Sequence, residues 1–600
     1  MSRGALVALA LTAAAPAAHA AAPTVHTDTA EVRACLPLPD GGALFGTAGG
    51  LVRATADGRR RALWTATSGL PGTRIEAVLG DGDHVWIGAD GGAARVRVDG
   101  ERLAIERTLA SAPVRDLVRH DGALYAATWG DGVLRVGARG GGARVAFAGG
   151  ARGARGRVAA MAVGDGALWA GTAAGLFVLR GARLEPVALP RAGGAAAPAV
   201  TSLHADGARL WIATSDGLFV REGGAVRPLG GGYLTRVTAV GGAVVVASLG
   251  DGLRVVDRGH LVALAGAPRA LRLAQAVAGA GEAACAGGLE GAWLRPSRAA
   301  GWRAAPAPAP EVPSNDVAAL ASDGGRLWVG TFDRGLAVHD GRGWRAVAHP
   351  DLDRRVNALL VEPRPGRASR LWIGTAAGLM VLDGDDVARL GRRDGLPGRG
   401  VLALARLRDG RIVAGTSSGA VLVGDGAPVP VGPPGTRIGN VWAVAEDADG
   451  WLWLGTTTGV WRGPATAEAK AGPRGAGWQR LAVATGHLDD DWVMAIAARG
   501  RAVWVGGYKS GVIRFDLDAP GREVTGPGVR LGGGWVNPAG LRWDGDRLLV
   551  ATQDGLKHGD GQRARWTPIG GAPGKDVTAT ADVDGARWIA TRRGLVRAAP

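Results

Sequence analysis

The feature that most constrains the fold is a sequence repeat that recurs fourteen times along the 600 residues. Its clearest copy is LWIGTAAGL, from Leu371 to Leu379, and similar strings begin at Leu168, Leu210 and Leu452. The second position of the string, here called the blade anchor, recurs about every 42 residues, which is the length of one β-propeller blade. The anchors are Phe45, Trp86, Tyr125, Trp169, Trp211, Val245, Cys285, Trp328, Trp372, Val413, Trp453, Trp504, Leu549 and Trp588.

Short apolar segments flank each anchor. Val317-x-x-Leu320 precedes one anchor, and Leu379 to Leu382 follows another. An inner strand, the anchor strand, a third strand and a short outer strand would form one sheet with two apolar faces, which cannot bury both faces alone. We therefore predict an all-β protein of two tandem seven-bladed β-propellers, with the large anchors filling the wedges between blades. No segment shows a sustained helical period, so we expect little helix.

The division into two rings also predicts domain boundaries. We expect a signal peptide at 1–20, a first propeller at 21–308 and a second at 309–600, joined near the proline-rich stretch Ala305 to Pro310. Blade 14 reaches only its third strand by Pro600. We expect Thr24 to Thr29 to supply its missing outer strand.

These repeats resemble the two-component regulator propeller repeat, whose pattern is LWIGTxxGL followed by a spacer. The spacer signature is present in Gly395-Leu396-Pro397 and in Pro313 to Val317. The resemblance implies paired seven-bladed propellers that act as the periplasmic ligand sensor of hybrid histidine kinases. Because no kinase segment follows the last repeat in this sequence, the resemblance implies a binding role and not a kinase role.

The first twenty residues are typical of a secretory signal peptide. Arg3 precedes an apolar run from Ala5 to Ala15, and Ala18-His19-Ala20 is a small-x-small cleavage motif. We expect cleavage after Ala20, a periplasmic or secreted location and no transmembrane segment in the mature chain.

The formal net charge of +16 comes almost entirely from arginine. It fits either the amino-acid bias of an arginine-rich genome or an affinity for acidic glycans and anionic surfaces. Nucleic acid is not an expected partner of an exported protein.

The chain has two cysteines, Cys35 in blade 1 and Cys285 in blade 7. These blades become neighbours if the first ring closes, and an even pair in an exported protein favours a disulfide. The alternative is two separate buried thiols that pack as small apolar groups.

In a four-stranded blade, the loops before the first strand and between the second and third strands open on the same rim, where propellers usually carry their function. In the first propeller, basic residues enter the inner strands, and convergent arginines would suit a carboxylate, sulfate or phosphate. The alternative is a solvated arginine-rich rim. These residues are Arg33, Arg74, Arg115, Arg157 and Arg236, with Arg152 and Arg155 in a nearby loop.

The corresponding loops of the second propeller combine aromatic residues with Asp and Asn, a pairing that suits sugar rings. Alternatively, Trp492 and Trp535 plug the channel. The candidate residues are Asn440, Asp489, Asp490, Asp491, Trp492, Tyr508, Lys509, Trp535 and Asn537.

Signals for catalysis are sparse. Gly415-Thr416-Ser417-Ser418-Gly419 matches G-x-S-x-G but lies in a hairpin turn, without the helix of a nucleophile elbow. No metal-ligand spacing or cofactor motif is present, so we expect neither a metal nor a cofactor.

Three functions remain open from the sequence. The first is a non-catalytic, sensor-like binding protein for a small molecule, a glycan or an envelope protein. The second is a glycan-cleaving hydrolase or lyase acting between the two propellers, with Asp333 and one of Asp489 to Asp491 as a carboxylate pair. The third is a purely structural role.

Overall fold

The structure is a computed structural model that describes residues 24–137, 142–150, 153–190, 197–305, 312–465, 477–518 and 523–598. The expected signal peptide at 1–20, Arg152 and the expected domain boundary between 308 and 309 lie outside these residues. Among the described residues, no helix is long and apolar enough to cross a bilayer.

The described residues form thirteen four-stranded sheets and one five-stranded sheet. In twelve of the four-stranded sheets, four consecutive strands pair antiparallel in chain order. The fifth strand, β14 (Ala146–Phe147), runs parallel to β18 (Arg183–Val187) in the sheet of blade 4. Helix in these residues is limited to 3-10 turns of three or four residues, such as η1 (Ala66–Ser68). The predicted all-β class is confirmed.

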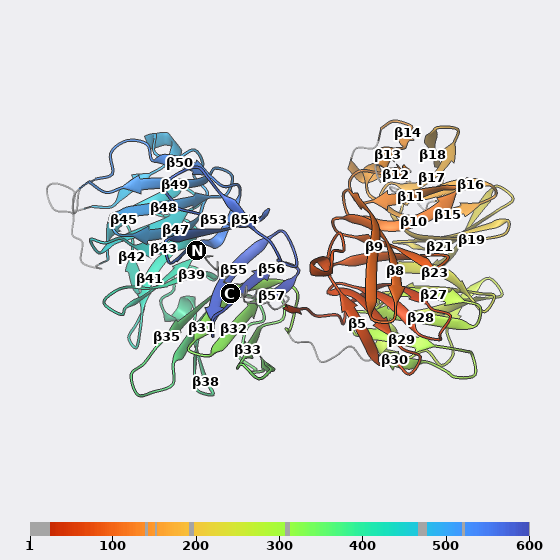
Figure 1. The fold of residues 1–600 in the computed structure, drawn as a ribbon, viewed down its shortest axis with the longest axis horizontal. Helices are drawn as coiled ribbons and strands as arrows, with labels where there is room; N and C mark the ends of the chain where they lie inside the picture. Colours follow the sequence, from red (N-terminus) through yellow and green to blue (C-terminus); the bar gives the residue numbers. More distant parts are fainter. Residues whose placement is uncertain are drawn as a thin grey trace, which may run out of the picture.

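The sheets form two rings of seven, which lie side by side in Figure 1, one coloured red to yellow-green and the other green to blue. In each ring the inner strands of successive blades contact one another, and the last contacts the first. The first ring has the inner strands β2 (Val32–Pro37), β6 (Ile75–Asp81), β10 (Val114–His120), β15 (Val158–Gly164), β19 (Val200–Asp206), β23 (Leu234–Val240) and β27 (Ala274–Ala280). The second has β31 (Val317–Asp323), β35 (Val356–Glu362), β39 (Val401–Arg406), β43 (Val441–Glu446), β47 (Val493–Arg499), β51 (Val536–Asp544) and β55 (Val577–Val583).

The tryptophan anchors lie in the wedges between blades. Trp169 of blade 4, for example, packs with Leu203, Leu210 and Phe219 of blade 5. Burying so large an apolar side chain at each wedge contributes about 2–3 kcal/mol per residue. All of them are at most 6% exposed: Trp86, Trp169, Trp211, Trp328, Trp372, Trp453, Trp504 and Trp588.

The first ring is also closed by a covalent bond. Cys35 and Cys285 form a disulfide with their Cα atoms 6.1 Å apart, between β2 and β28 (Ala283–Gly288). Cys285 occupies the anchor position of blade 7, so the disulfide lies where eight other blades have a tryptophan side chain. Phe45 packs beside it.

The second ring is closed by the start of the chain. β1 (Thr24–His26) pairs antiparallel with β57 (Gly594–Ala598) and completes the sheet of blade 14. The expectation that Thr24 to Thr29 supplies the missing outer strand is confirmed for Thr24–His26. Residues 24–26 therefore belong to the second ring, although the boundary expected from the sequence placed them in the first.

Candidate functional site

A cavity of about 350 Å³ lies at the mouth of the first ring, where loops lead into the inner strands. Three of the predicted arginines, Arg33, Arg115 and Arg236, line it together with Glu76 and Trp129. These arginines come from blades 1, 3 and 6, so only closure of the ring brings them together. We call this cavity the channel mouth.

Glu76 organises the arginines of the channel mouth. Its side chain is 5% exposed and lies 2.6 Å from Arg74 Nε, 2.8 Å from Arg115 Nη1 and 3.5 Å from Arg33 Nη1. Burial lowers the pKa of Arg74; the charge of Glu76 opposes this shift, and the neighbouring positive charges of Arg33 and Arg115 add to it. Arg33 also pairs with Glu31, so two carboxylates face the three guanidiniums of Arg33, Arg74 and Arg115, and one positive charge remains in excess.

Arg236 is held differently. Its Nη2 donates to the backbone oxygen of Arg33 over 3.3 Å, and its charge acts on the buried Asp116. Burial raises the pKa of Asp116, although Arg236 and hydrogen bonds from the backbone N–H groups of Met161 and Leu117 oppose the rise.

Two aromatic side chains at the channel mouth were missed by the sequence analysis. Trp129 is 39% exposed and Tyr233 is 50% exposed. Arg115 Cζ lies 5.0 Å from the centroid of the Trp129 ring, within cation–π range. Trp129 follows β11 (Ala123–Thr128) in the loop between the second and third strands. This is a loop in which the sequence predicts functional residues, so Trp129 could have been identified from its place in the repeat.

The other predicted arginines of this rim lie elsewhere. Arg74 contacts Glu76 but lines the cavity between the propellers. Arg157 is exposed, and its backbone pairs with that of Trp129. Arg155 donates to the backbone oxygen of Gly149 over 2.8 Å.

In the second ring, three of the predicted residues form an aromatic row. The ring centroids of Trp492 and Tyr508 are 4.9 Å apart, and those of Tyr508 and Trp535 are 5.3 Å apart. Trp492 is 41% exposed and Trp535 is 46% exposed. The row thus presents ring surface to solvent.

The predicted polar residues of this rim mostly support its loops. Asp489 pairs with Arg530 at 2.7 Å, and this hydrogen bond holds the pKa of Asp489 below its usual value. Asp490 accepts from the backbone N–H groups of Trp492 and Lys509, and Asp491 from that of Val483. Asn537 is buried and donates to Asp576 and to the backbone of Val577, whereas Asn440 is half-buried. These contacts engage the polar groups within the rim, whereas the rings of Trp492 and Trp535 stay partly exposed.

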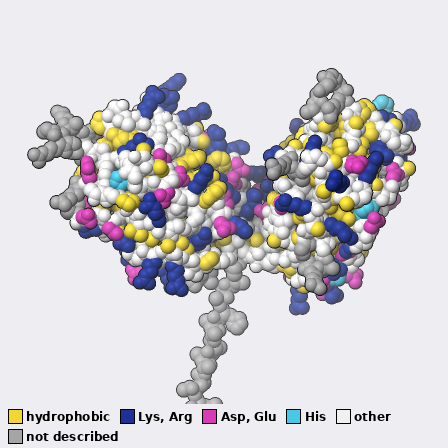
Figure 2. Space-filling view, turned by 90° about the horizontal axis from the view of Figure 1, so that it is seen from above, with side chains coloured by type: hydrophobic (Ala, Val, Ile, Leu, Met, Phe, Trp, Pro, Cys, Tyr) yellow, Lys and Arg dark blue, Asp and Glu magenta, His cyan; other side chains and the backbone are white. Residues whose placement is uncertain are grey.

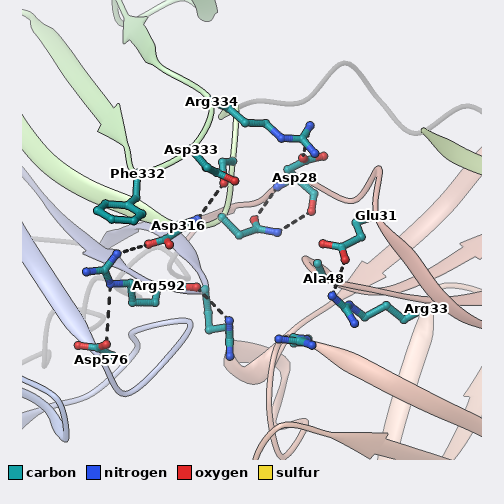
Figure 3. A pocket seen from close by; sticks show the side chains of 14 residues that line it. Asp28, Glu31, Arg33, Ala48, Asp316, Phe332, Asp333, Arg334, Asp576 and Arg592 are labelled. Atoms are coloured by element: carbon teal, nitrogen blue, oxygen red, sulfur yellow. Dashed lines mark hydrogen bonds and ion pairs between the residues drawn. The ribbon is translucent and has the colours of Figure 1, made fainter. Parts of the chain in front are cut away.

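A second cavity, of about 520 Å³, lies between the two propellers (Figure 3). We call it the inter-propeller cavity. Figure 2 shows the two lobes with basic and acidic side chains along the waist between them. The carboxylates that line the cavity are Asp28, Glu31, Asp316, Asp333 and Asp576, and the guanidiniums are Arg33, Arg74, Arg334, Arg592 and Arg593.

Many of these charges are paired with one another. Arg592 Nη1 lies 2.6 Å from Asp316 Oδ1, and Arg593 Nε lies 2.7 Å from Asp90 Oδ2 of the first propeller. Asp28 is 5% exposed, and its backbone exchanges two hydrogen bonds of 2.7 Å with the Asn315 side chain. Burial raises the pKa of Asp28, and the charge of Asp333 adds to that rise. Asp489 to Asp491 do not line this cavity, so the carboxylate pair expected from the sequence does not form here.

Within the described part of the chain, no group of three or more His, Cys, Asp or Glu side chains is placed to hold a metal ion. Ser417 and Ser418 belong to the G-x-S-x-G string that the sequence predicts to be a hairpin turn. They do lie in the turn between β40 (Ile412–Thr416) and β41 (Gly419–Val423).

Known proteins share this fold at low sequence identity. PorZ, an essential bacterial surface component of the type-IX secretion system of Porphyromonas gingivalis, matches with a TM-score of 0.66 and 16% identity, over 96% of this chain and 87% of that one. An ancestral GH74 enzyme matches with a TM-score of 0.60 and 14% identity, over 96% and 99%. An extracellular domain assigned to a hybrid two component system of B. thetaiotaomicron matches with a TM-score of 0.39 and 16% identity, over 96% of this chain and 82% of that one.

No curated protein matches this sequence. Residues 437–458, which include all of β43 and β44 (Trp451–Thr456) in blade 11, match the family described as two component regulator propeller. The chain is therefore a tandem seven-bladed β-propeller that carries the two component regulator propeller repeat.

Proposed function

We propose that this chain is an exported, non-catalytic binding protein that recognises an anionic ligand, such as an acidic saccharide, at the channel mouth of the first propeller. The observation that carries this proposal is the convergence of Arg33, Arg115 and Arg236 beside the exposed rings of Trp129 and Tyr233. Guanidinium groups suit a carboxylate or sulfate, and an aromatic face suits the C–H side of a sugar ring.

The excess of positive charge supports an anionic ligand over a neutral one. Glu76 already neutralises part of this charge, and a bound carboxylate would reduce the repulsion that remains among the guanidiniums. The likeness in fold to PorZ, a bacterial surface protein, supports a place in the cell envelope. A sensor-like role, with a small molecule, glycan or envelope protein as partner, follows from the repeat family.

A binding screen tests this proposal. The purified protein is titrated calorimetrically with oligogalacturonate, a heparin-derived oligosaccharide and neutral cello-oligosaccharide, and each mixture is analysed for cleavage products. We expect an acidic oligosaccharide to bind without being cleaved, and Arg236→Gln or Trp129→Ala to weaken binding at least about tenfold, which corresponds to roughly 1.4 kcal/mol.

Arg155→Gln is the matched control, because Arg155 carries the same charge but contacts the Gly149 backbone. It should bind as the parent does. Equal binding of the neutral oligosaccharide, or unchanged affinity in both channel-mouth variants, would contradict the proposal.

A second candidate is glycan cleavage in the inter-propeller cavity. It is favoured by one observation: two carboxylates, those of Asp28 and Asp333, line this cavity together. Burial raises the pKa of Asp28, as a general acid requires, although the hydrogen bond from the Ala30 N–H and the charge of Arg334 oppose that rise. The likeness in fold to a GH74 enzyme is compatible with it. Reducing-end products that vanish in both Asp28→Asn and Asp333→Asn would favour cleavage over binding.

A further inference from the structure

The tryptophan anchors share a second partner besides the neighbouring blade. In each of the eight tryptophan blades an arginine Cζ lies 4.7 to 5.9 Å from the anchor ring centroid. Arg221 of blade 5, for example, lies 4.7 Å over Trp169 of blade 4. A filled wedge in this protein is thus an indole between aliphatic side chains, covered by a guanidinium.

Blade 6 has Val245 at the anchor position, in β24 (Ala243–Ser248). A cavity of about 550 Å³ lies at this wedge between blades 6 and 7, and Val245 lines it. We call it the blade 6 cavity. Its apolar lining includes Val240, Val255, Val262 and Leu264.

The other wedges without a tryptophan contain packed side chains. The disulfide of Cys285 and the ring of Phe45 lie in the wedge of blade 7, and Trp461 and Trp478 pack against the cluster around Val413. Leu549 packs with Leu556, Ile589 and Val596. At the blade 6 wedge, Trp293 and Trp302 pack against the cluster around Val245, and Val245 itself lines the cavity.

The guanidinium for this wedge is present, although no indole stands at the anchor position. Arg295 lies four residues after the hairpin glycine of β29 (Gly291–Arg295), which is the position that Arg221 holds in β21 (Gly217–Glu222). Arg295 Cζ lies 5.3 Å over the ring of Trp302, and both residues line the blade 6 cavity.

Two hydrogen-bond donors at this cavity lack an acceptor. Arg295 Nε and the indole Nε1 of Trp302 are buried and make no hydrogen bond. Arg295 Nη2 reaches only the backbone oxygen of Glu282, at 3.4 Å. Burial lowers the pKa of Arg295, and the positive charge of Arg298 adds to that effect while Glu282 opposes it. An unpaired buried donor is destabilising, so an acceptor at this position would be stabilising.

We propose that the blade 6 cavity binds a small aromatic carboxylate, whose ring takes the place of the missing anchor indole and whose carboxylate accepts hydrogen bonds from Arg295 and Trp302. Apolar walls with a few convergent donors are typical of small-molecule sites. Asp257 and Glu282 also line the cavity, so we expect a ligand with a single carboxylate to bind better than one with several. This site shares no lining residue with the channel mouth and does not depend on the function proposed there.

Titration with indole-3-acetate, phenylacetate and neutral indole tests the proposal, with binding followed by calorimetry and by tryptophan fluorescence. We expect the two carboxylates to bind and indole to bind at least about tenfold more weakly, because it lacks the acceptor for Arg295. Indole binding as tightly as indole-3-acetate, or no binding of either carboxylate, would overturn the proposal.

Two variants locate the site. Val245→Trp restores the anchor found in eight other blades and should abolish binding without lowering the melting temperature. Arg295→Gln should weaken binding at least about tenfold even if Val245→Trp fails to fold. Arg303→Gln, which removes an exposed charge from the next strand, is the matched control and should bind normally. Binding that survives Arg295→Gln but is lost in Arg236→Gln would assign the ligand to the channel mouth instead.

Discussion

Glu76 is the residue around which the arginines of the channel mouth are arranged. Its buried carboxylate contacts Arg33, Arg74 and Arg115, which come from three consecutive blades of one ring. Because a buried charge must be paired, these contacts fix the guanidiniums in place before any ligand arrives. A preorganised group of this kind loses less side-chain entropy on binding.

Asp116 makes stability depend on pH at the same rim. Burial raises its pKa in the folded protein, so the unfolded chain releases this proton first as the pH rises. The contribution of Asp116 to the free energy of unfolding is therefore complete below the ordinary Asp pKa. It is lost as the pH rises through the pKa that Asp116 has in the folded protein. We expect Asp116→Asn to remove this decline, measured as the change in urea midpoint with pH.

The comparison with the parent protein isolates Asp116 from carboxylates whose pKa values are lowered, such as Asp489. Carboxylates with lowered pKa values contribute stability that is lost as the pH falls, and they do so equally in the parent and in the variant. The same dependence on pH in parent and variant would show that Asp116 does not titrate as described.

The anchors and some rim positions could be predicted because each depends on one residue at a fixed place in the repeat. Trp492 and Trp535 follow from that place, and they do form an exposed row with Tyr508. Glu76 and Tyr233 could not be singled out, since their roles depend on which blades meet across a ring. The same holds for the blade 6 cavity: the sequence places Val245 at an anchor position, but packing decides whether a neighbouring side chain fills the wedge.

At the scale of the elements, the two rings are closed by different devices. The first uses a disulfide at an anchor position, and the second uses β1, which lies beside the last strand of the chain. Both devices join the first and last blades, where a ring has no continuous chain to hold it. The disulfide and β1 therefore stabilise the wedge between the first and last blades of each propeller.

Loss of the disulfide should destabilise the first propeller. Cys35 and Cys285 are separated by 250 residues, and a loop of that size corresponds to about 5.5 kcal/mol in the chain-entropy treatment. We expect Cys285→Ser to lower the thermal midpoint of the first propeller. Thiol titration of the denatured, unreduced parent should find no free thiol, and two free thiols would contradict the bond.

Removal of β1 should destabilise the second propeller instead. The strand supplies backbone pairing to β57, and the His26 ring stacks 5.2 Å from that of Trp588. We expect deletion of residues 21–29 to lower the melting temperature by several degrees, since about 1 kcal/mol corresponds to roughly 2–4 °C at this domain size. His26→Ala keeps the pairing and should have a smaller effect, and an unchanged melting temperature after the deletion would refute the role of β1.

At the scale of the molecule, polar contacts join the two propellers. Arg593 pairs with Asp90, and Thr73 Oγ1 donates to the backbone oxygen of Pro573 over 2.6 Å. Interfaces of this polar kind permit relative motion of domains unless they are large and apolar. The shape of the inter-propeller cavity therefore depends on a small number of hydrogen bonds.

Asp90→Asn should loosen this arrangement without unfolding either propeller. A partly exposed ion pair contributes about 1 kcal/mol or less, so the melting temperature should barely change. We expect a broader distribution of distances between the propellers, measured by pulsed electron spin resonance between one spin label on each propeller. Glu101→Gln alters an exposed pair within the first propeller and is the control; identical distributions in Asp90→Asn and the parent would show that the pair does not hold the two together.

The position of β1 has a consequence for how the protein is made. Its three residues belong to the second propeller, yet a ribosome produces them before any other described part of the chain, and their partner strand β57 last. The first propeller has all its strands by residue 305 and can assemble while synthesis or export continues. The second cannot finish until β57 has been made, so a chain cut short before β57 would leave β1 unpaired and open to proteolysis.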